Sequence, residues 1–241
     1  MLDTADGKPL GPQGFRARSY PDPMASTRAV LLDLWDTTAW GEPPPPEERL
    51  SIQLGVPEAV LFDGFERTRV YRGTGGPRTA EESLAVVVEA CGVDPEPGFV
   101  RRLTEMHISF LRRGVHLYDD TIRVLRELRG RGMKTAIVSN CDHFTRPAVE
   151  ALGLEDEVDA VILSFELGAM KPDADIYEGA LRRLDVGAED STFVDDQADY
   201  CDGAVALGIR ALRIERATEE DPYDPERHPL IRDLETLLDL V

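Results

Sequence analysis

The sequence predicts an α/β protein in which a doubly wound parallel sheet is accompanied by a small, all-helical domain. Short apolar runs that end on polar residues alternate with helical stretches over most of the chain, which is the order expected of parallel strands joined by crossover helices. Residues 41–116 interrupt this alternation, because their apolar positions follow a helical period. A chain of 241 residues that is 42% hydrophobic is long enough to bury both cores.

The N-terminal part of the chain predicts a tail, a strand and a spacer. Residues 1–27 are rich in Gly, Pro and Asp and contain no apolar block, so we expect a flexible tail outside the core. The apolar run at 29–32 is typical of a buried parallel strand. After Trp40 the run GEPPPPEERL predicts a stiff polyproline spacer, because proline cannot continue a strand.

Helical periodicity dominates the next part of the chain, and Thr79 is expected to cap one helix with Glu82 as its reciprocal partner. The closing run PLIRDLETLLDLV predicts an amphipathic helix. Helices are predicted at 58–70, 79–90 and 98–113, and strands at 133–139, 159–163, 192–194 and 210–214. The expected division is a tail (1–27), a core (28–40 and 117–241) and a helical domain (41–116).

Asp33 stands directly after the first predicted strand, at the end of the sheet where open α/β proteins bind their ligands. A single Asp in this position is also typical of a turn or a helix cap. If Asp33 is a nucleophile, a second acid two residues later would protonate the leaving group. Trp35 occupies that place.

Other predicted strands also end on polar residues, at Ser139 and Asn140 and at the adjacent pair Asp195 and Asp196. Two adjacent carboxylates after a buried strand repel one another unless a cation offsets their charge, so the pair favours a metal site over a solvated turn. Lys171 lies between these segments and is one of only three lysines among 27 basic residues. Ser139 is equally suited to cap a helix, and the alternative for Lys171 is a surface position.

The ordered set Asp33, Ser139, Lys171 and Asp195–Asp196 resembles the motifs of the haloacid dehalogenase (HAD) superfamily, from Arg28 to about Glu215. This resemblance implies a Rossmann-like core with a helical cap inserted after the first motif, and a hydrolase whose nucleophile is Asp33. Ser139 would hold a phosphate oxygen and Lys171 would neutralise nucleophile and phosphate. Mg²⁺ is the implied cofactor, with Asp33, Asp195, Asp196 and the backbone carbonyl of Trp35 as its ligands.

Substrate-binding residues are predicted beside the reacting centre, at Trp35 and Asn140, and in the cap. The Gly-rich run 72–79 would bring backbone N–H groups and the guanidiniums of Arg72 and Arg78 over the site, although an ordinary helix connection has the same pattern. His143 follows Ser139 closely enough to reach the site as a proton-transfer group. A solvent-facing histidine is the alternative.

The leading functional prediction is a Mg²⁺-dependent phosphatase that acts on a small phosphorylated metabolite through an aspartyl-phosphate. Most phosphatases of the superfamily carry an Asp at the place of Trp35, and without it ordinary alkyl phosphates should react about 10²–10⁴-fold more slowly. One alternative is metal-independent displacement of halide from a 2-haloacid, whose enzymes have an aromatic residue there. The other is a catalytically silent binding or regulatory module. The phosphonate-cleaving branch is excluded, because it needs a cap lysine and residues 41–116 contain none.

Composition excludes other partners. A net charge of −19 argues against sequence-independent binding to nucleic acid, which rests on cations that neutralise phosphates. No apolar run approaches the ~18 residues of a membrane-spanning helix. Cys91, Cys141 and Cys201 lack metal-ligand spacing and are expected to be reduced thiols in a cytoplasmic protein. The oligomeric state is not encoded in any readable pattern.

Overall fold

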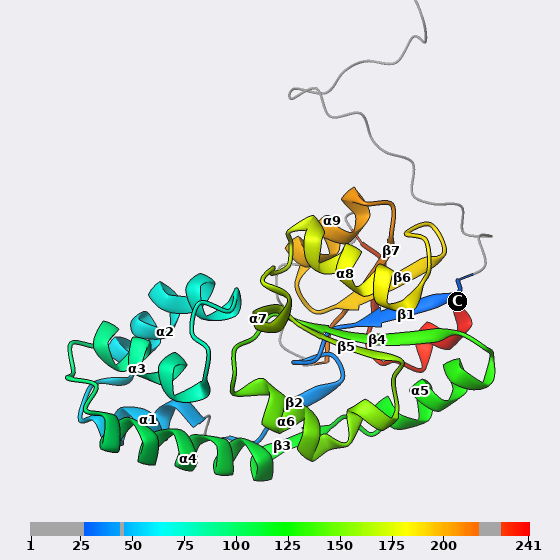
Figure 1. Cartoon of the computed structure of the whole chain (residues 1–241). Coiled ribbons are helices and arrows are strands. Elements are labelled where there is room, and N and C mark those ends of the chain that lie inside the picture. The colour runs from blue at the N-terminus through cyan, green and yellow to red at the C-terminus, as the bar shows by residue number, and fades with distance from the viewer. Residues whose placement is uncertain (1–26, 44–45, 217–227) are drawn as a thin grey trace, which may run out of the picture.

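The computed structural model describes residues 27–43, 46–216 and 228–241, so almost all of the predicted N-terminal tail lies outside the described residues. Its centre is a six-stranded parallel sheet in the order β5-β4-β1-β6-β7-β8 (Figure 1). The strands are β1 (Ala29–Leu32), β4 (Lys134–Ser139), β5 (Ala160–Leu163), β6 (Ser191–Asp195), β7 (Arg210–Ile214) and β8 (Leu230–Ile231). The predicted α/β sheet is thereby confirmed.

β1 lies in the middle of the sheet because both of its faces are apolar. Val30 and Leu32 pack into the hydrophobic core on one face, and Ala29 and Leu31 into the core on the other. This alternation follows from the two-residue period of a strand. The neighbours of β1 are β4 on one side and β6 on the other, so the strand order switches direction at β1, and such a switch point opens a crevice at the carboxyl ends of the strands.

Helices cover both faces of the sheet, as expected of a doubly wound fold. Helices α5 (Thr121–Gly130) and α6 (Thr145–Leu152) pack on one face. Helices α8 (Ala174–Leu184) and α9 (Ala198–Ala206) pack on the other, and the single-turn α7 (Ser164–Leu167) follows β5.

The C-terminal segment departs from the prediction of an amphipathic helix. Leu230 and Ile231 form the edge strand β8 beside β7, and only Thr236–Asp239 form a short 3₁₀ turn. Leu234 and Leu237 are fully buried in the main core, and the Leu234 N–H donates to the Asp120 carboxylate at 2.8 Å. Pairing with an unfilled sheet edge outweighs the helical period, because propensity is weak compared with tertiary packing.

Four helices form a separate unit, drawn cyan to green in Figure 1: α1 (Pro46–Leu54), α2 (Glu58–Gly73), α3 (Ala80–Ala90) and α4 (Pro97–Gly114). The spacer prediction was wrong from Pro46 onwards. Proline fits the first turn of a helix, where its missing N–H has no partner to lose, and Leu50 is buried in the core of this unit.

The hydrogen bonds predicted for the N-terminal cap of helix α3 are confirmed in part. The Thr79 side chain accepts a hydrogen bond from the Glu82 N–H at 3.1 Å, as expected. The Glu82 carboxylate reaches back by one residue more than predicted and accepts from the Arg78 N–H at 2.8 Å. These two hydrogen bonds fix where the Gly-rich connection enters the helix, although the second one goes to Arg78 and not to the N-cap residue.

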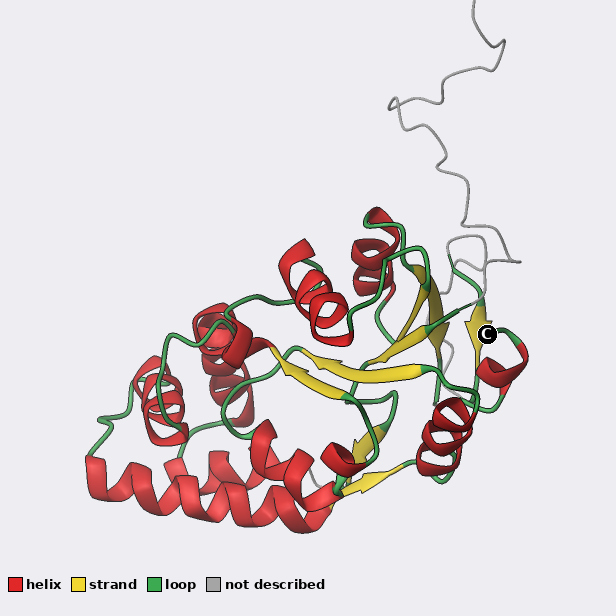
Figure 2. Ribbon diagram, turned by 45° about the vertical axis from the view of Figure 1, so that its right-hand side comes forward, coloured by secondary structure: helices red, strands yellow, loops and turns green. Residues whose placement is uncertain are grey.

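Both connections between the helical unit and the sheet pass through one pair of short antiparallel strands, β2 (Ala39–Gly41) and β3 (Val115–Leu117). The domain limits expected from the sequence fall on this pair. The carboxyl ends of the central strands point toward the helical unit (Figure 2). Within the described part of the chain, no helix combines the length and the apolar character needed to cross a membrane.

Candidate active site

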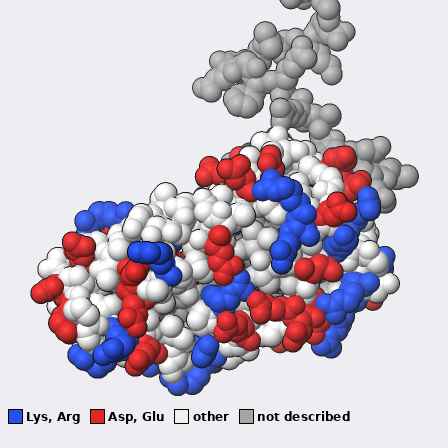
Figure 3. Space-filling view, in the orientation of Figure 1, with Lys and Arg blue, Asp and Glu red and all other residues white. Residues whose placement is uncertain are grey.

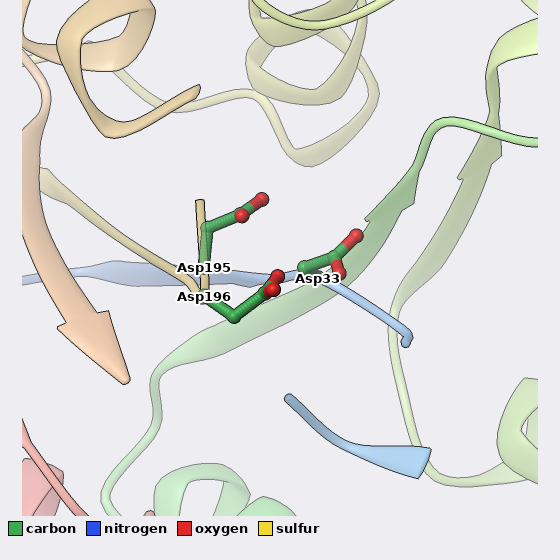
Figure 4. A group of neighbouring side chains, drawn as sticks. All are labelled: Asp33, Asp195 and Asp196. Atoms are coloured by element: carbon green, nitrogen blue, oxygen red, sulfur yellow. The ribbon is translucent and has the colours of Figure 1, made fainter. Parts of the chain in front are cut away.

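Three carboxylates meet at the carboxyl edge of the sheet. Asp33 follows β1, while Asp195 and Asp196 stand at the end of β6 (Figure 4). The parallel register pairs Leu32 with Val194, and the Asp33 N–H donates to the Val194 carbonyl at 2.9 Å, so these strand ends lie side by side. One oxygen from each carboxylate lies within 4.8 Å of the others.

Lys171 lies between two of these carboxylates. Its Nζ donates to Oδ1 of Asp33 at 2.5 Å and to Oδ2 of Asp195 at 2.6 Å, and the residue is 3% exposed. Burial by itself would lower the pKa of Lys171, but the charges of Asp33 and Asp195 outweigh it and raise the pKa. The ammonium is therefore charged at neutral pH and fixed against the candidate nucleophile.

Asn140 holds the Lys171 segment rather than pointing away from it. Its Oδ1 accepts from the Lys171 N–H at 2.6 Å, and its Nδ2 donates to the Lys171 carbonyl at 2.8 Å. Both polar atoms of this predicted substrate-binding side chain contact the Lys171 backbone. Asn140 also lines the pocket described below, so it connects the lysine to that pocket.

The charges at the sheet edge do not balance without a cation. Burial raises the pKa of Asp33, Asp195 and Asp196, because each carboxylate is withdrawn from water. When all three carboxylates are ionised, they leave two net negative charges against the one ammonium, with Asp33 and Asp195 buried and Asp196 half-buried, and a divalent cation offsets that charge. Hard carboxylate oxygens are the ligands that Mg²⁺ prefers, so these residues fit the metal that the motifs imply.

The turn after Asp33 leaves one further oxygen available. The Leu34 carbonyl accepts from the Ala39 N–H at 2.8 Å, and the Asp36 N–H donates to the Ala39 carbonyl at 2.8 Å. This bridge does not use the carbonyl of Trp35. A tryptophan side chain at position 35 therefore leaves the main-chain carbonyl of this residue available as a metal ligand.

Ser139 ends β4 beside Asp33. The register pairs Leu32 with Ile137, which brings Ser139 to the same edge of the sheet. Its side chain is fully buried, and its hydroxyl has no hydrogen-bond partner among the described residues. An unpartnered buried hydroxyl costs about 1–3 kcal/mol, so its place beside Asp33 is better explained by a ligand than by stability.

A pocket of about 800 Å³ separates the helical unit from the sheet edge. The core residues that line it include Trp35, Asn140, Cys141, Asp142, Phe144 and Met170. The lining residues of the helical unit, called the cap below, include Leu61, Phe62, Phe65, Arg69, Arg72 and His107. Trp35 also packs against the main core, so one part of its side chain is anchored while the residue lines the pocket. Asp33, Ser139 and Lys171 are not part of this lining, but Trp35 and Asn140 place the pocket within two residues of Asp33 and one of Ser139 along the chain.

The other predicted substrate-binding residues, Arg72 and Arg78 of the helical unit and His143 of the core, differ in where they lie. Arg72 lines the pocket and forms an ion pair with Asp142 of the core. Arg78 is exposed and lies outside the pocket lining. His143 also lies outside the lining: its Nε2 is 3.0 Å from the Pro77 carbonyl, and its ring lies 4.3 Å from that of Phe165. Of these three, the structure brings only Arg72 to the pocket.

Close packing between the two units involves a glycine of α2 and one of the loop after it. A Cβ at Gly75, whose φ is +76°, would lie 2.4 Å from the Phe165 carbonyl oxygen, and one at Gly73 would lie 2.5 Å from Sδ of Met170. On the same side, Arg69 donates to the Tyr200 hydroxyl at 2.5 Å. The Gly-rich run thus lets the cap approach the core, a role that its sequence pattern allowed but did not specify.

Sequence reasoning missed several residues that line the pocket. Asp142, His107 and Arg69 had no distinguishing pattern, because each lies within an ordinary helix or loop sequence. His107 is buried, and burial together with the nearby Arg72 lowers its pKa to about 4, so its imidazole is neutral at neutral pH. Only the packing of α2 and α4 over the sheet brings these side chains together.

Comparison with known proteins agrees with this arrangement. The chain is similar to a ribulose-1,5-bisphosphate 5-phosphatase of Halopiger xanaduensis, with 30% identity over 80% of this chain and 87% of that protein. It is also similar to (S)-2-haloacid dehalogenase 1 of Pseudomonas sp., with 31% identity over 62% of this chain and 65% of that one. A HAD phosphatase structure from Thermococcus onnurineus matches with a TM-score of 0.62 and 25% identity over 89% of this chain and 97% of that chain.

A family model described as haloacid dehalogenase-like hydrolase matches residues 27–208, which is most of the chain. The matched range contains the first strand, the helical unit and the three strand ends described above. The order of motifs in the sequence had predicted the same assignment. This protein therefore belongs to the haloacid dehalogenase-like hydrolases.

Proposed function

We propose that this hydrolase is a Mg²⁺-dependent phosphatase that acts on a small phosphorylated metabolite through an aspartyl-phosphate on Asp33. The observation that carries the proposal is the group of three carboxylates, two of them buried, with Lys171 beside a Ser139 hydroxyl that has no hydrogen-bond partner among the described residues. This arrangement offers a nucleophile, a cation site and a phosphate-oxygen donor at one sheet edge. The phosphatases among the relatives support the same reading.

The residues divide the reaction between them. A carboxylate oxygen of Asp33 attacks phosphorus, the bond from phosphorus to the leaving oxygen breaks, and water later hydrolyses the aspartyl-phosphate to regenerate Asp33 and release phosphate. Ser139 donates its hydroxyl to a phosphoryl oxygen, and Lys171 offsets the charge of nucleophile and phosphoryl group. Bound Mg²⁺ would supply positive charge for the phosphoryl oxygens, held by Asp33, Asp195, Asp196 and the Trp35 carbonyl.

Trp35 restricts which esters react quickly. An indole cannot protonate a departing alkoxide, and the neighbouring Asp36 is exposed and lies in a left-handed turn with φ of 53°. The leaving group must therefore be a good one or carry its own proton. Aryl and acyl phosphates meet this requirement better than simple alkyl phosphates.

A second candidate function is displacement of halide from a 2-haloacid, which needs no general acid. The aromatic residue at position 35 and the similarity to the Pseudomonas dehalogenase favour it. The three clustered carboxylates, two of them buried, oppose it, because a metal-independent enzyme would have to keep their mutual repulsion without a bound divalent cation. A catalytically silent binding module is the third candidate, and the intact set of reactive side chains opposes that one.

Purified full-length protein should be assayed on acyl, aryl and alkyl phosphates and on 2-chloropropionate, with Mg²⁺ and with EDTA. We expect release of phosphate that depends on Mg²⁺, fastest with acyl and aryl phosphates. Release of chloride that EDTA leaves unchanged would replace the phosphatase proposal by the dehalogenase one. If neither product forms, the silent-module reading holds.

Mg²⁺ is expected to raise the melting temperature of the protein more at about pH 7 than at about pH 4. In the metal-free fold burial raises the pKa of the three aspartates, so the contribution of these groups to stability is greatest at low pH and falls as pH rises through their folded-state pKa values, because the carboxylates then ionise. Mg²⁺ offsets that charge only when the carboxylates are ionised. Thermal scans with and without Mg²⁺ across this range measure the effect.

Asp196→Asn serves as the comparison, because Asp196 makes no direct ion pair with Lys171 among the described residues. This variant should be more stable than the wild type without metal at neutral pH, and Mg²⁺ should stabilise it less. If Mg²⁺ raised the melting temperature equally at both pH values, or equally in the wild type and the variant, this would argue against a metal site at these carboxylates.

A further inference from the structure

The pocket between cap and core offers little free positive charge. The guanidinium of Arg72 pairs with Asp142, and it also donates to the Thr68 hydroxyl at 2.9 Å and to the Phe65 carbonyl at 3.1 Å. Arg69 is exposed, and its guanidinium donates to the Tyr200 hydroxyl. Arg72 is thus committed to a buried internal contact, and a second anionic group on a substrate would meet only the exposed Arg69.

Negative charge is more abundant in the pocket lining. Glu48, Glu58 and Glu66 line it, and in the described chain no side-chain hydrogen bond or ion pair involves any of them. Together with Asp142 they set four carboxylates against two guanidiniums, because the neutral imidazole of His107 adds no charge. Acidic and basic side chains are interspersed over the face shown in Figure 3, and the chain as a whole is acidic, with a net charge of −19.

Apart from Asn140 and Thr145, the remaining lining is largely apolar. Phe62 is 65% exposed although it is a large aromatic side chain, and it stands among the pocket residues of α2. The other apolar residues of the lining are Trp35, Ala59, Leu61, Phe65, Leu111, Phe144 and Met170. Exposed aromatic surface around a concave site is typical of a binding site for an apolar group.

We propose, on the basis of the proposed phosphatase function, that the substrate is a phosphate monoester whose leaving group is an apolar, preferably aromatic, alcohol without a second anionic group. The phosphoryl group meets Lys171, Ser139 and the cation site, while the alcohol lies between Trp35 and the aromatic side chains of α2. A carboxylate or second phosphate on the alcohol would lie among the unpaired glutamates. A cationic substituent would be accepted there.

The test uses three aryl phosphates that differ in charge but have similar leaving groups: 4-ethylphenyl phosphate, 4-(2-aminoethyl)phenyl phosphate and 4-(carboxymethyl)phenyl phosphate. A methylene insulates each charge from the ring, so the acidity of the phenol changes little. With the full-length chain and Mg²⁺, we expect kcat/KM for the first two to exceed that for the carboxymethyl ester by about tenfold or more. Each further methylene of the alkyl substituent that the pocket buries should raise kcat/KM about fourfold.

Variants identify the source of this preference. Glu58→Gln combined with Glu66→Gln should narrow the gap between the carboxymethyl and ethyl esters, mainly through KM. Glu89→Gln removes one carboxylate charge from an exposed position of α3 outside the pocket lining, and it should leave the difference in kcat/KM between the two esters unchanged.

The outcomes separate this inference from the proposed function. Equal or faster turnover of the carboxymethyl ester would overturn the proposed leaving-group preference and leave the phosphatase function standing. The preference would also be overturned if the double variant did not reduce the difference in kcat/KM between the carboxymethyl and ethyl esters, or if Glu89→Gln reduced that difference equally. Absence of phosphate release from every ester in the panel would overturn both.

Discussion

Asp33→Asn is expected to abolish phosphate release, by at least about 10⁴-fold, while the fold is retained. Asparagine has almost the same shape as aspartate, and Lys171 keeps its second contact with Asp195 at 2.6 Å. The substitution removes the nucleophilic oxygen and one of three crowded negative charges, so the metal-free variant should not be less stable than the wild type. Steady-state rates, circular dichroism and thermal scans measure these effects.

Asp36→Asn is the matched control for this substitution. Asp36 is an exposed aspartate three residues further along, and asparagine tolerates its positive φ of 53°. It should keep most of the activity. Beryllium fluoride, a mimic of an aspartyl-phosphate, should raise the melting temperature of the wild type in the presence of Mg²⁺ but not that of Asp33→Asn. Rates like those of the wild type in Asp33→Asn, with deamidation excluded by mass spectrometry, would rule out covalent catalysis by Asp33.

Trp35→Asp is expected to raise turnover of alkyl phosphates, with a ceiling near the ~10²–10⁴-fold contribution of one general acid. Aryl and acyl phosphates should gain least, because their leaving groups depart without a proton. The quantity to measure is the slope of log rate against the pKa of the leaving group, which should be steep in the wild type and flatter in the variant.

Trp35→Phe keeps an aromatic ring without adding an acid, so it should show no such change in slope. Trp35 packs against the main core and lines the pocket, so the smaller aspartate leaves space that water can fill. Trp35→Asn leaves almost the same space as Trp35→Asp but adds no acid, so comparison of these two variants separates the effect of the acid from the effect of that cavity. If the wild type already hydrolyses alkyl phosphates quickly with a flat slope, the absence of an acid at position 35 is no handicap.

Much of the core could be predicted because its pattern is local. The apolar run of β1 alternates between two buried faces, and polar residues directly after parallel strands must meet at one edge of the sheet. Asp33, Ser139 and Asp195 were found in this way from the sequence. Their catalytic and metal-binding roles remain predictions, which the experiments above address.

The cap and the chain ends could not be predicted equally well, because their structure depends on partners far away in sequence. A run of four prolines predicted a spacer where α1 begins, and this helix is stabilised by the burial of Leu50. The amphipathic pattern of the C-terminal segment fits a helix, yet β7 offered an open edge that Leu230 and Ile231 fill. The contact of Arg72 with Asp142 joins residues 70 positions apart, and no periodicity in the sequence predicts such a pair.

The antiparallel pairing of β2 with β3 makes the helical unit an insertion whose two ends are already neighbours, since Gly41 faces Val115. Opposite residues in such a pair lie only about 5 Å apart, so closing the core without the unit would cost little chain entropy. We expect that the helical unit of a relative can be exchanged at these two strands without moving Asp33 or Lys171. Such an exchange should change the part of the leaving-group preference that the helical unit sets, while the part set by Trp35 and the phosphoryl chemistry stay with the core.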